Sequence, residues 1–336
     1  MKLPMPRLLT FLFAALLGLF LAPMTFAASA PILQRPYDLD TGHGVLRGTL
    51  LLPQRASPPP LAILVAGSGP TDRDGNNPEG GNNAYLRRLA EALAANGVAS
   101  VRYDKRGIAR SRDAGPDERQ LSLDGYVDDL VAWSDRLAED PRFGPQVLVG
   151  HSEGALIASL AAPRSKATAL ALISGSGRPI DKVLREQLSV RLPPPLLARA
   201  DTILDQLRAG RQVAEVPPQL TALFRPSVQP YLISLFRHDP ARALAEVRQP
   251  TLILQGTSDI QVDVADAQAL ARAKPDAELR LIGGMNHVLR IVPADVQKQL
   301  ASYNDPGLPL ARELVERLVT FIQRGAAQNP PSNSAG

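Results

Sequence analysis

The sequence predicts an α/β protein with a mostly parallel central sheet flanked by helices. Short, uninterrupted apolar runs, such as residues 61–66 and 147–149, are typical of strands buried on both faces of a parallel sheet. Amphipathic helical stretches separate these runs, and strands that alternate with helices form βαβ units with right-handed crossovers. The alternation stops over residues 176–248, where only helical spacing is left. We therefore expect a layered α/β core with a helical cap inserted after the sixth strand.

The first half of the chain alternates predicted strands and helices. In chain order we expect strands over 45–52, 61–66 and 98–103, and helices over 85–96 and 126–137. In the first helix, Leu89 and Leu93 recur on one face, and Gly97 is placed to end it. Each strand is thus followed by a helix that can cross back over the sheet.

The second half continues the pattern on both sides of the cap. We expect strands over 147–149, 167–173, 251–255 and 278–282, and helices over 155–160 and 310–322. The closing helix is supported by apolar neighbours such as Leu314 and Leu318. The polar residues 327–336 predict a disordered tail.

The predicted cap is assigned from its position in the chain. Leu184, Leu188 and Leu192 have helical spacing, and prolines recur through the segment. Ordinary packing helices have the same spacing, so the spacing alone leaves that alternative open. The insertion between two core strands favours a cap over 176–248, with the core formed by 28–175 and 249–326.

The N-terminus has the layout of a secretory signal peptide. Lys2 and Arg7 precede the uncharged apolar run 8–22, and small residues follow. We expect cleavage after Ala27, because a cut after Ala30 would place a proline immediately downstream. An uncleaved membrane anchor is the alternative, for which the run is short. The leader predicts a periplasmic or secreted protein with no stable membrane span after cleavage.

The composition excludes several classes of function. The 336 residues are 45% hydrophobic and 21% charged, as in an ordinary globular protein. The net charge of +4 comes from interspersed residues, without the basic block that nucleic-acid binding requires. The chain has no cysteine, which excludes disulfides, thiolate metal sites and a cysteine nucleophile. We expect no metal, no cofactor and no nucleic-acid partner.

A G-x-S-x-G pentapeptide, Gly150 to Gly154, lies between a predicted strand and a predicted helix. A serine hydroxyl is a poor nucleophile unless it is exposed, paired with a base and set beside fixed N–H donors. A sharp strand-to-helix turn exposes Ser152, and the two glycines permit the close approach of strand and helix. Ser152 is therefore the candidate nucleophile.

The ends of later strands supply the groups that Ser152 needs. Ligands of open parallel sheets bind outside the carboxyl ends of the strands, and Asp259 and His287 each follow a predicted strand there. We expect His287 to act as general base and acid and Asp259 to orient it. The backbone N–H groups of Glu153 and Ser68 are the candidate oxyanion donors.

Competing assignments are weaker at each position. His43 falls in an N-terminal turn, His151 is fixed within the pentapeptide and His238 lies in the cap. Asp263 and Asp266 compete with Asp259, whose position at the strand end favours it. The side chain of Glu153 is interpreted as structural or pocket-lining.

With these motifs in order, the chain resembles the α/β-hydrolase superfamily, and within it the bacterial esterase and serine-aminopeptidase-like branch. The resemblance spans about residues 32–325 and rests on segments 66–75, 102–107, 150–154, 250–259 and 286–287. It implies a Ser152–Asp259–His287 triad and a small acyl substrate, by analogy a carboxylic ester. Ala66 replaces the histidine often found before the oxyanion glycine, which makes the exact donor less certain.

Several alternatives stay open or are excluded. A serine aminopeptidase-like peptidase and an acyltransferase remain within the enzymes, and a non-catalytic exported binding protein remains outside them. Gly67-Ser68-Gly69 lacks the third glycine of a dinucleotide loop, and segment 72–83 lacks the glycine register and terminal glutamate of a calcium loop. A dehalogenase would need a carboxylate at position 152.

Two further interpretations concern substrate binding. Loops 72–74 and 104–106 could bind substrate charge, but we favour internal salt bridges that rigidify the oxyanion loop. An apolar cluster in the cap would suit an acyl chain and so favours esters; its members are Tyr231, Leu232, Leu235 and Phe236. The substrate-binding residues are not otherwise identified.

Overall fold

The structure is a computed structural model that describes residues 31–328 of the chain. The predicted leader 1–27, its cleavage site and residues 329–336 lie outside the described residues.

A sheet of eight strands forms the centre of the protein, in the order β1-β4-β6-β5-β7-β8-β9-β10. Its strands are β1 (Ile32–Pro36), β4 (Gly48–Pro53), β5 (Leu61–Val65), β6 (Ala99–Tyr103), β7 (Gln146–His151), β8 (Ala169–Ile173), β9 (Thr251–Gly256) and β10 (Glu278–Ile282). Only the β1–β4 and β4–β6 pairs are antiparallel, and the five other pairs are parallel. The predicted mostly parallel sheet is confirmed.

The sequence pattern missed the first strand of this sheet. β1 is largely exposed along its whole length, so it carries none of the apolar alternation that marks a buried strand. The strand predicted over 45–52 is interrupted at Arg47 and divides into β3 (Val45–Leu46) and β4. β3 pairs instead with β2 (Leu39–Asp40) in a separate two-stranded ribbon.

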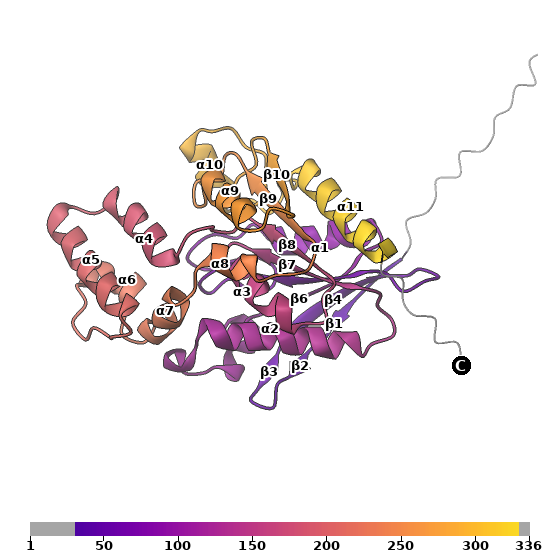
Figure 1. The fold of residues 1–336 in the computed structure, drawn as a ribbon, viewed down its shortest axis with the longest axis horizontal. Helices are drawn as coiled ribbons and strands as arrows, with labels where there is room; N and C mark the ends of the chain where they lie inside the picture. The colour runs from indigo at the N-terminus through magenta and orange to yellow at the C-terminus, as the bar shows by residue number, and fades with distance from the viewer. Residues whose placement is uncertain (1–30, 329–336) are drawn as a thin grey trace, which may run out of the picture.

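Helices cover both faces of the sheet (Figure 1). One face carries α1 (Tyr85–Ala95) and α11 (Arg312–Gln328), and the other carries α2 (Leu123–Ala138), α3 (Glu153–Ala161), α8 (Pro240–Ala245) and α9 (Val264–Ala273). Two apolar cores result, because alternate residues of β5 point to opposite faces. Ile63 and Val65 belong to the core under α2 and α3, whereas Ala62 and Leu64 belong to the core under α1 and α11.

The end of the chain differs slightly from its prediction. α11 continues to Gln328, so residues 327 and 328 are helical rather than part of a disordered tail. A short helix, α10 (Val296–Ser302), was also not predicted. The remaining short helical turns are η1 (Ala109–Ala114), η2 (Glu118–Gln120), η3 (Ala162–Arg164) and η4 (Pro218–Leu220).

Five helices lie between β8 and β9, in the segment predicted as a cap. Besides α8 they are α4 (Ile180–Ser189), α5 (Pro194–Arg208), α6 (Thr221–Phe224) and α7 (Gln229–Phe236). The labels α4 to α7 lie together at one end of the layered core in Figure 1, whereas α8 packs on α3 and α9 within the layers. Among residues 31–328, no helix is both long and apolar enough to cross a membrane.

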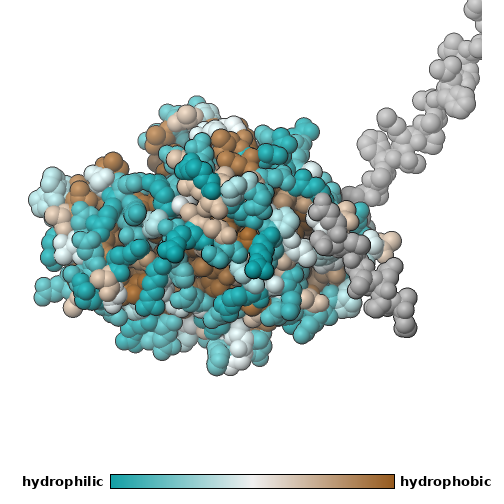
Figure 2. Space-filling view, viewed as in Figure 1, coloured by the Kyte–Doolittle hydropathy of each residue, from teal (hydrophilic) through white to brown (hydrophobic). Residues whose placement is uncertain are grey.

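The face shown in Figure 2 is mostly hydrophilic, and its hydrophobic residues show mainly in hollows between hydrophilic side chains. The apolar cap residues are largely hidden, because Leu232 is 6% exposed and Phe236 is 1% exposed. They pack into the same core as the α2 and α3 helices.

Candidate active site

Ser152 occupies the sharp turn between β7 and α3. Its backbone has φ 55° and ψ −121°, a strained conformation for a residue with a side chain. The glycines beside it are required by close packing: a Cβ on Gly150 would lie 2.1 Å from the Gly154 oxygen, and one on Gly154 would lie 2.4 Å from the Val65 oxygen. The pentapeptide therefore forms the tight strand-to-helix turn that its sequence predicts.

Asp259 and His287 meet across two different loops. The parallel strands β9 and β10 are neighbours, so the loops that follow them lie together, and His287 Nδ1 lies 2.9 Å from Asp259 Oδ2. The other carboxylate oxygen accepts hydrogen bonds from the backbone N–H groups of Gln261, at 2.8 Å, and Val262, at 3.0 Å. Burial raises the pKa of Asp259, but the His287 charge and these hydrogen bonds outweigh it and lower the pKa to about 2. Asp259 is therefore an ionised partner for the imidazole.

The competing residues have structural partners elsewhere. Asp263 accepts a hydrogen bond from the Ala265 N–H at the start of α9. The carboxylate of Asp266 binds the Arg178 guanidinium. His238 lies 3.0 Å from Asp124, away from His287. Of the three aspartates considered, only Asp259 contacts the imidazole of His287.

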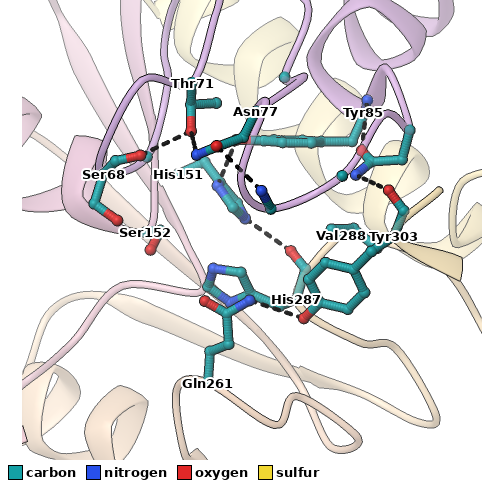
Figure 3. A pocket seen from close by; sticks show the side chains of 15 residues that line it. Ser68, Thr71, Asn77, Tyr85, His151, Ser152, Gln261, His287, Val288 and Tyr303 are labelled. Atoms are coloured by element: carbon teal, nitrogen blue, oxygen red, sulfur yellow. Dashed lines mark hydrogen bonds between the residues drawn. The ribbon is translucent and has the colours of Figure 1, made fainter. Parts of the chain in front are cut away.

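Ser152, His287 and Ser68 line one cavity of about 120 Å³ (Figure 3). The Ser152 hydroxyl and the His287 ring both face this space in the close-up, and no hydrogen bond joins them. Such hydrogen bonds are often long in unliganded enzymes and shorten when substrate binds. The structure thus brings the candidate nucleophile and base to one cavity without a direct bond.

His151, which precedes the nucleophile, is buried and bonded at both ring nitrogens. Nε2 lies 2.8 Å from the main-chain oxygen of His287, and Nδ1 lies 2.8 Å from the Tyr85 hydroxyl. A carbonyl can only accept, so Nε2 carries the proton and Nδ1 accepts from Tyr85. Burial and the nearby His287 charge lower the pKa of His151 to about 3, so its ring is neutral at ordinary pH.

The candidate oxyanion donors lie on two sides of Ser152. Glu153 is the first residue of α3, where backbone N–H groups have no partner within the helix. Ser68 follows Gly67, whose Cβ position lies 3.1 Å from Ser152 Cβ. The loop is held by the Thr71 hydroxyl, which donates to the Ser68 oxygen at 2.7 Å. Both backbone groups are therefore adjacent to the nucleophile.

Internal salt bridges brace the loops that follow β5 and β6, as predicted. Arg73 Nη2 lies 3.0 Å from Asp104 Oδ2, and Asp104 is 1% exposed. Arg102 Nε lies 2.8 Å from Asp74 Oδ1. Burial raises the pKa of Asp104, and the hydrogen bond and charge of Arg73 oppose that rise. These carboxylates neutralise the loop's own arginines, so the prediction of internal pairing is confirmed.

Sequence reasoning missed most of the cavity wall. Its polar lining includes Thr71, Asn77, Gln261 and Tyr303, and the Gln261 amide donates to the Tyr303 hydroxyl at 2.9 Å. Thr71 and Asn77 lie in the loop after β5, Gln261 lies in the loop after β9, and Tyr303 lies at the end of α10. The apolar cap cluster is absent from the lining and buried in the core. The argument from the cap for an acyl chain therefore loses its basis.

No group of three or more histidine, aspartate or glutamate residues within residues 31–328 could hold a metal ion. The chemistry available at this cavity is that of a hydroxyl, an imidazole, a carboxylate and backbone N–H groups. Together these can activate an alcohol, hold a tetrahedral oxyanion and move a proton.

Comparison with known protein families agrees with this arrangement. The family described as "Serine aminopeptidase, S33" matches residues 82–291, a segment that includes Ser152, Asp259 and His287 and begins after Ser68. The α/β-hydrolase resemblance is confirmed at the level of the superfamily.

Individual relatives are distant. "Esterase EstD" of Thermotoga maritima is 26% identical over 247 residues, which are 73% of this chain and 58% of that protein. "Putative carbamate hydrolase RutD" of Azorhizobium caulinodans is 27% identical over 245 residues, which are 66% of this chain and 86% of that protein. The chain thus spans less than two thirds of the length of EstD.

Solved structures share the fold. "Est1E from Butyrivibrio proteoclasticus" superposes with a TM-score of 0.56 and 18% sequence identity, covering 87% of this chain and 99% of that one. Identity this low supports the architecture and says nothing about the substrate.

Proposed function

Because the chain belongs to the serine aminopeptidase S33 family of α/β-hydrolases, we propose that it is an exported serine hydrolase that cleaves carboxylic esters. The observation that carries this proposal is the 2.9 Å contact between His287 Nδ1 and Asp259 Oδ2 at the cavity that Ser152 lines. An imidazole oriented by a buried carboxylate can accept a proton from a nearby hydroxyl.

The reaction proceeds in two halves. Ser152 Oγ attacks the ester carbonyl carbon while His287 Nε2 takes its proton, and the carbonyl oxygen becomes an oxyanion held by the Ser68 and Glu153 N–H groups. The imidazolium then protonates the departing alcohol, which leaves an acyl group on Ser152. Water, deprotonated by His287, attacks this acyl group and releases the acid. Asp259 stays ionised and stabilises the imidazolium in both halves.

We favour esters over amides as substrates on the basis of one relative. The buried cap cluster gives no support to either class. EstD is named an esterase and matches 73% of this chain. The second candidate is a peptidase that releases N-terminal residues, which the printed description of the family favours. The small, mostly polar cavity does not distinguish an esterase from a peptidase.

The test is turnover of matched substrates by the purified protein. We expect hydrolysis of p-nitrophenyl acetate and butyrate at a kcat/KM at least tenfold above that of aminoacyl p-nitroanilides. Ser152→Ala should lose about 10⁴-fold or more in kcat while keeping the fold. Faster release of p-nitroaniline would favour the peptidase. A folded protein that turns over neither substrate and resists a fluorophosphonate would instead be a binding protein.

Export is a separate part of the proposal and rests on the sequence of residues 1–30. Expression of the full chain in a Gram-negative host should place the protein in the periplasm or the medium, with Ala28 as its first residue. Fractionation of the cells checks the location, and Edman sequencing of the recovered protein checks the first residue. A protein that retains Met1 in the membrane fraction would support an uncleaved anchor.

A further inference from the structure

Lys105 is a buried cation beside the candidate active site, and the mechanism above does not use it. It follows Asp104 after β6, and the residue is only 2% exposed. Burial lowers the pKa of Lys105, and the Glu153 carboxylate opposes that shift. Burying an ammonium group costs several kcal/mol unless it is paired and hydrogen-bonded. The partners of Lys105 therefore indicate the role of its ammonium group.

The first partner is the main chain of the oxyanion loop. Lys105 Nζ donates a hydrogen bond to the Gly67 carbonyl oxygen. That oxygen and the Ser68 N–H belong to one planar trans peptide group and point in opposite directions. Fixing the carbonyl on the side of Lys105 therefore fixes the direction of the Ser68 N–H. Gly67 lies against Ser152, with only 3.1 Å between its Cβ position and Ser152 Cβ, so a small rotation of this peptide would move the donor relative to the reacting carbon.

The second partner belongs to the other candidate donor. Lys105 Nζ lies 3.7 Å from Glu153 Oε1, and the Glu153 side chain is 7% exposed. The backbone N–H of Glu153 is the first of α3 and lies directly after the nucleophile. One ammonium group thus contacts the Gly67–Ser68 peptide group, through the Gly67 carbonyl, and the side chain of Glu153. A cation held there would also favour negative charge on the nearby carbonyl oxygen.

One tyrosine ring packs against the cation, and a second tyrosine packs against the first. Lys105 Nζ lies 5.5 Å from the centre of the Tyr126 ring, within the range of a cation–π contact. Tyr126 packs on Tyr231 with ring centres 5.6 Å apart. Burial and the neighbouring Glu153 carboxylate raise the pKa of Tyr231, which keeps its hydroxyl neutral. The ammonium group is therefore held in one place, with no access to substrate through the described cavity, which Lys105 does not line.

We propose that Lys105 is a positioning residue that orients the Gly67–Ser68 peptide and the start of α3 as one oxyanion site. The inference rests on the proposed acyl-transfer function and adds a group that acts through the two backbone donors. Its effect belongs to the transition state, because the ground-state carbonyl carries little charge for the donors to bind.

The experiment compares Lys105→Met with Lys274→Met. Lys274 is likewise a buried lysine, 5% exposed, but it pairs with Asp276 at the end of α9, away from the cavity. With p-nitrophenyl acetate, we expect Lys105→Met to lower kcat by about 10- to 100-fold with KM changed less than threefold, since losing a whole donor costs about 10²–10³. Lys274→Met should keep kcat within twofold. A trifluoromethyl ketone, which adds Ser152 Oγ to form a tetrahedral oxyanion, should lose affinity by the same factor as kcat/KM.

Further measurements distinguish a loss of positioning from a general loss of folding. Lys105→Arg keeps the charge with a different donor geometry and should recover part of the lost kcat. If Lys105→Met does not fold, as judged by circular dichroism and urea unfolding, Lys105→Arg carries the test and should show a kcat reduced at unchanged KM. A folded variant whose kcat and ketone affinity both stay within twofold of the wild type would overturn the inference. Absence of turnover in the wild type would instead overturn the proposed function.

Discussion

His151 and His287 are joined by a hydrogen bond between the His151 ring and the His287 main chain. The ring Nε2 lies 2.8 Å from the carbonyl oxygen, and the two imidazole centres are 4.8 Å apart. His151, the residue before Ser152, therefore fixes the backbone of His287. The turn that carries Ser152 and the loop after β10 are held together by this bond, although the side chains of Ser152 and His287 share no hydrogen bond.

Acid should destabilise the protein through His151. Its pKa is about 3 in the folded state and ordinarily 6.5, so the unfolded chain binds an extra proton between those values. Stability is therefore complete above pH 6.5 and falls by up to about 5 kcal/mol as the pH is lowered to 3. In urea unfolding, His151→Gln should show a shallower loss of stability over this pH range than the wild type. Equal slopes in the two proteins would contradict the prediction.

Asp259→Asn should reduce kcat by about 10⁴-fold, because an amide at this position favours the wrong imidazole tautomer and cannot stabilise the imidazolium. The matched control is Asp263→Asn, four residues away, whose side chain accepts the Ala265 N–H at the start of α9. Asparagine also caps helices well, so this control should keep its activity and stability. The rate of ester turnover is measured for both variants. Similar losses in the two variants would mean that the loop, and not the pairing with His287, is responsible.

Gly150→Ala should destabilise the protein by about 1–3 kcal/mol or more, because the added methyl must displace backbone. Its Cβ would lie 2.1 Å from the Gly154 oxygen and 2.7 Å from Ala155 Cα. Gly325→Ala is the comparison, since a Cβ there meets nothing within 4 Å in α11. That change should stabilise the helix by about 0.5–1 kcal/mol. Urea unfolding measures both, and a Gly150→Ala protein of wild-type stability would mean that the turn is looser than described.

Arg73→Met should cost about 3 kcal/mol or more of stability, because it leaves the buried Asp104 carboxylate without its ion pair. Arg312→Met removes a guanidinium that is 90% exposed and paired with Glu316 on the surface of α11. This second change should cost less than about 0.5 kcal/mol. Thermal and urea unfolding at neutral pH compare the two. Losses of the same size would show that the Asp104 pair is as solvated as the surface pair.

Much of the fold was predictable because its signals are local. A strand buried on both faces needs an unbroken apolar run, and segment 61–66 has one. The exposed strand β1 has no such requirement, so nothing in its sequence marks it. The requirement for glycine at position 150 is likewise local, because a Cβ there would lie 2.1 Å from the Gly154 oxygen. Gly154 is required by a distant segment, since a Cβ there would lie 2.4 Å from the Val65 oxygen of β5.

The sequence by itself determined the layered α/β architecture and the order Ser152, Asp259, His287, because backbone periodicity and turn chemistry act over a few residues. Only the tertiary structure decided which aspartate of 259, 263 and 266 faces the imidazole, since that depends on how β9 and β10 pair. It also placed the Lys105 ammonium on the Gly67 carbonyl, 38 residues away in sequence. Contacts between distant segments depend on the packing of the whole sheet, and no short stretch of sequence encodes them.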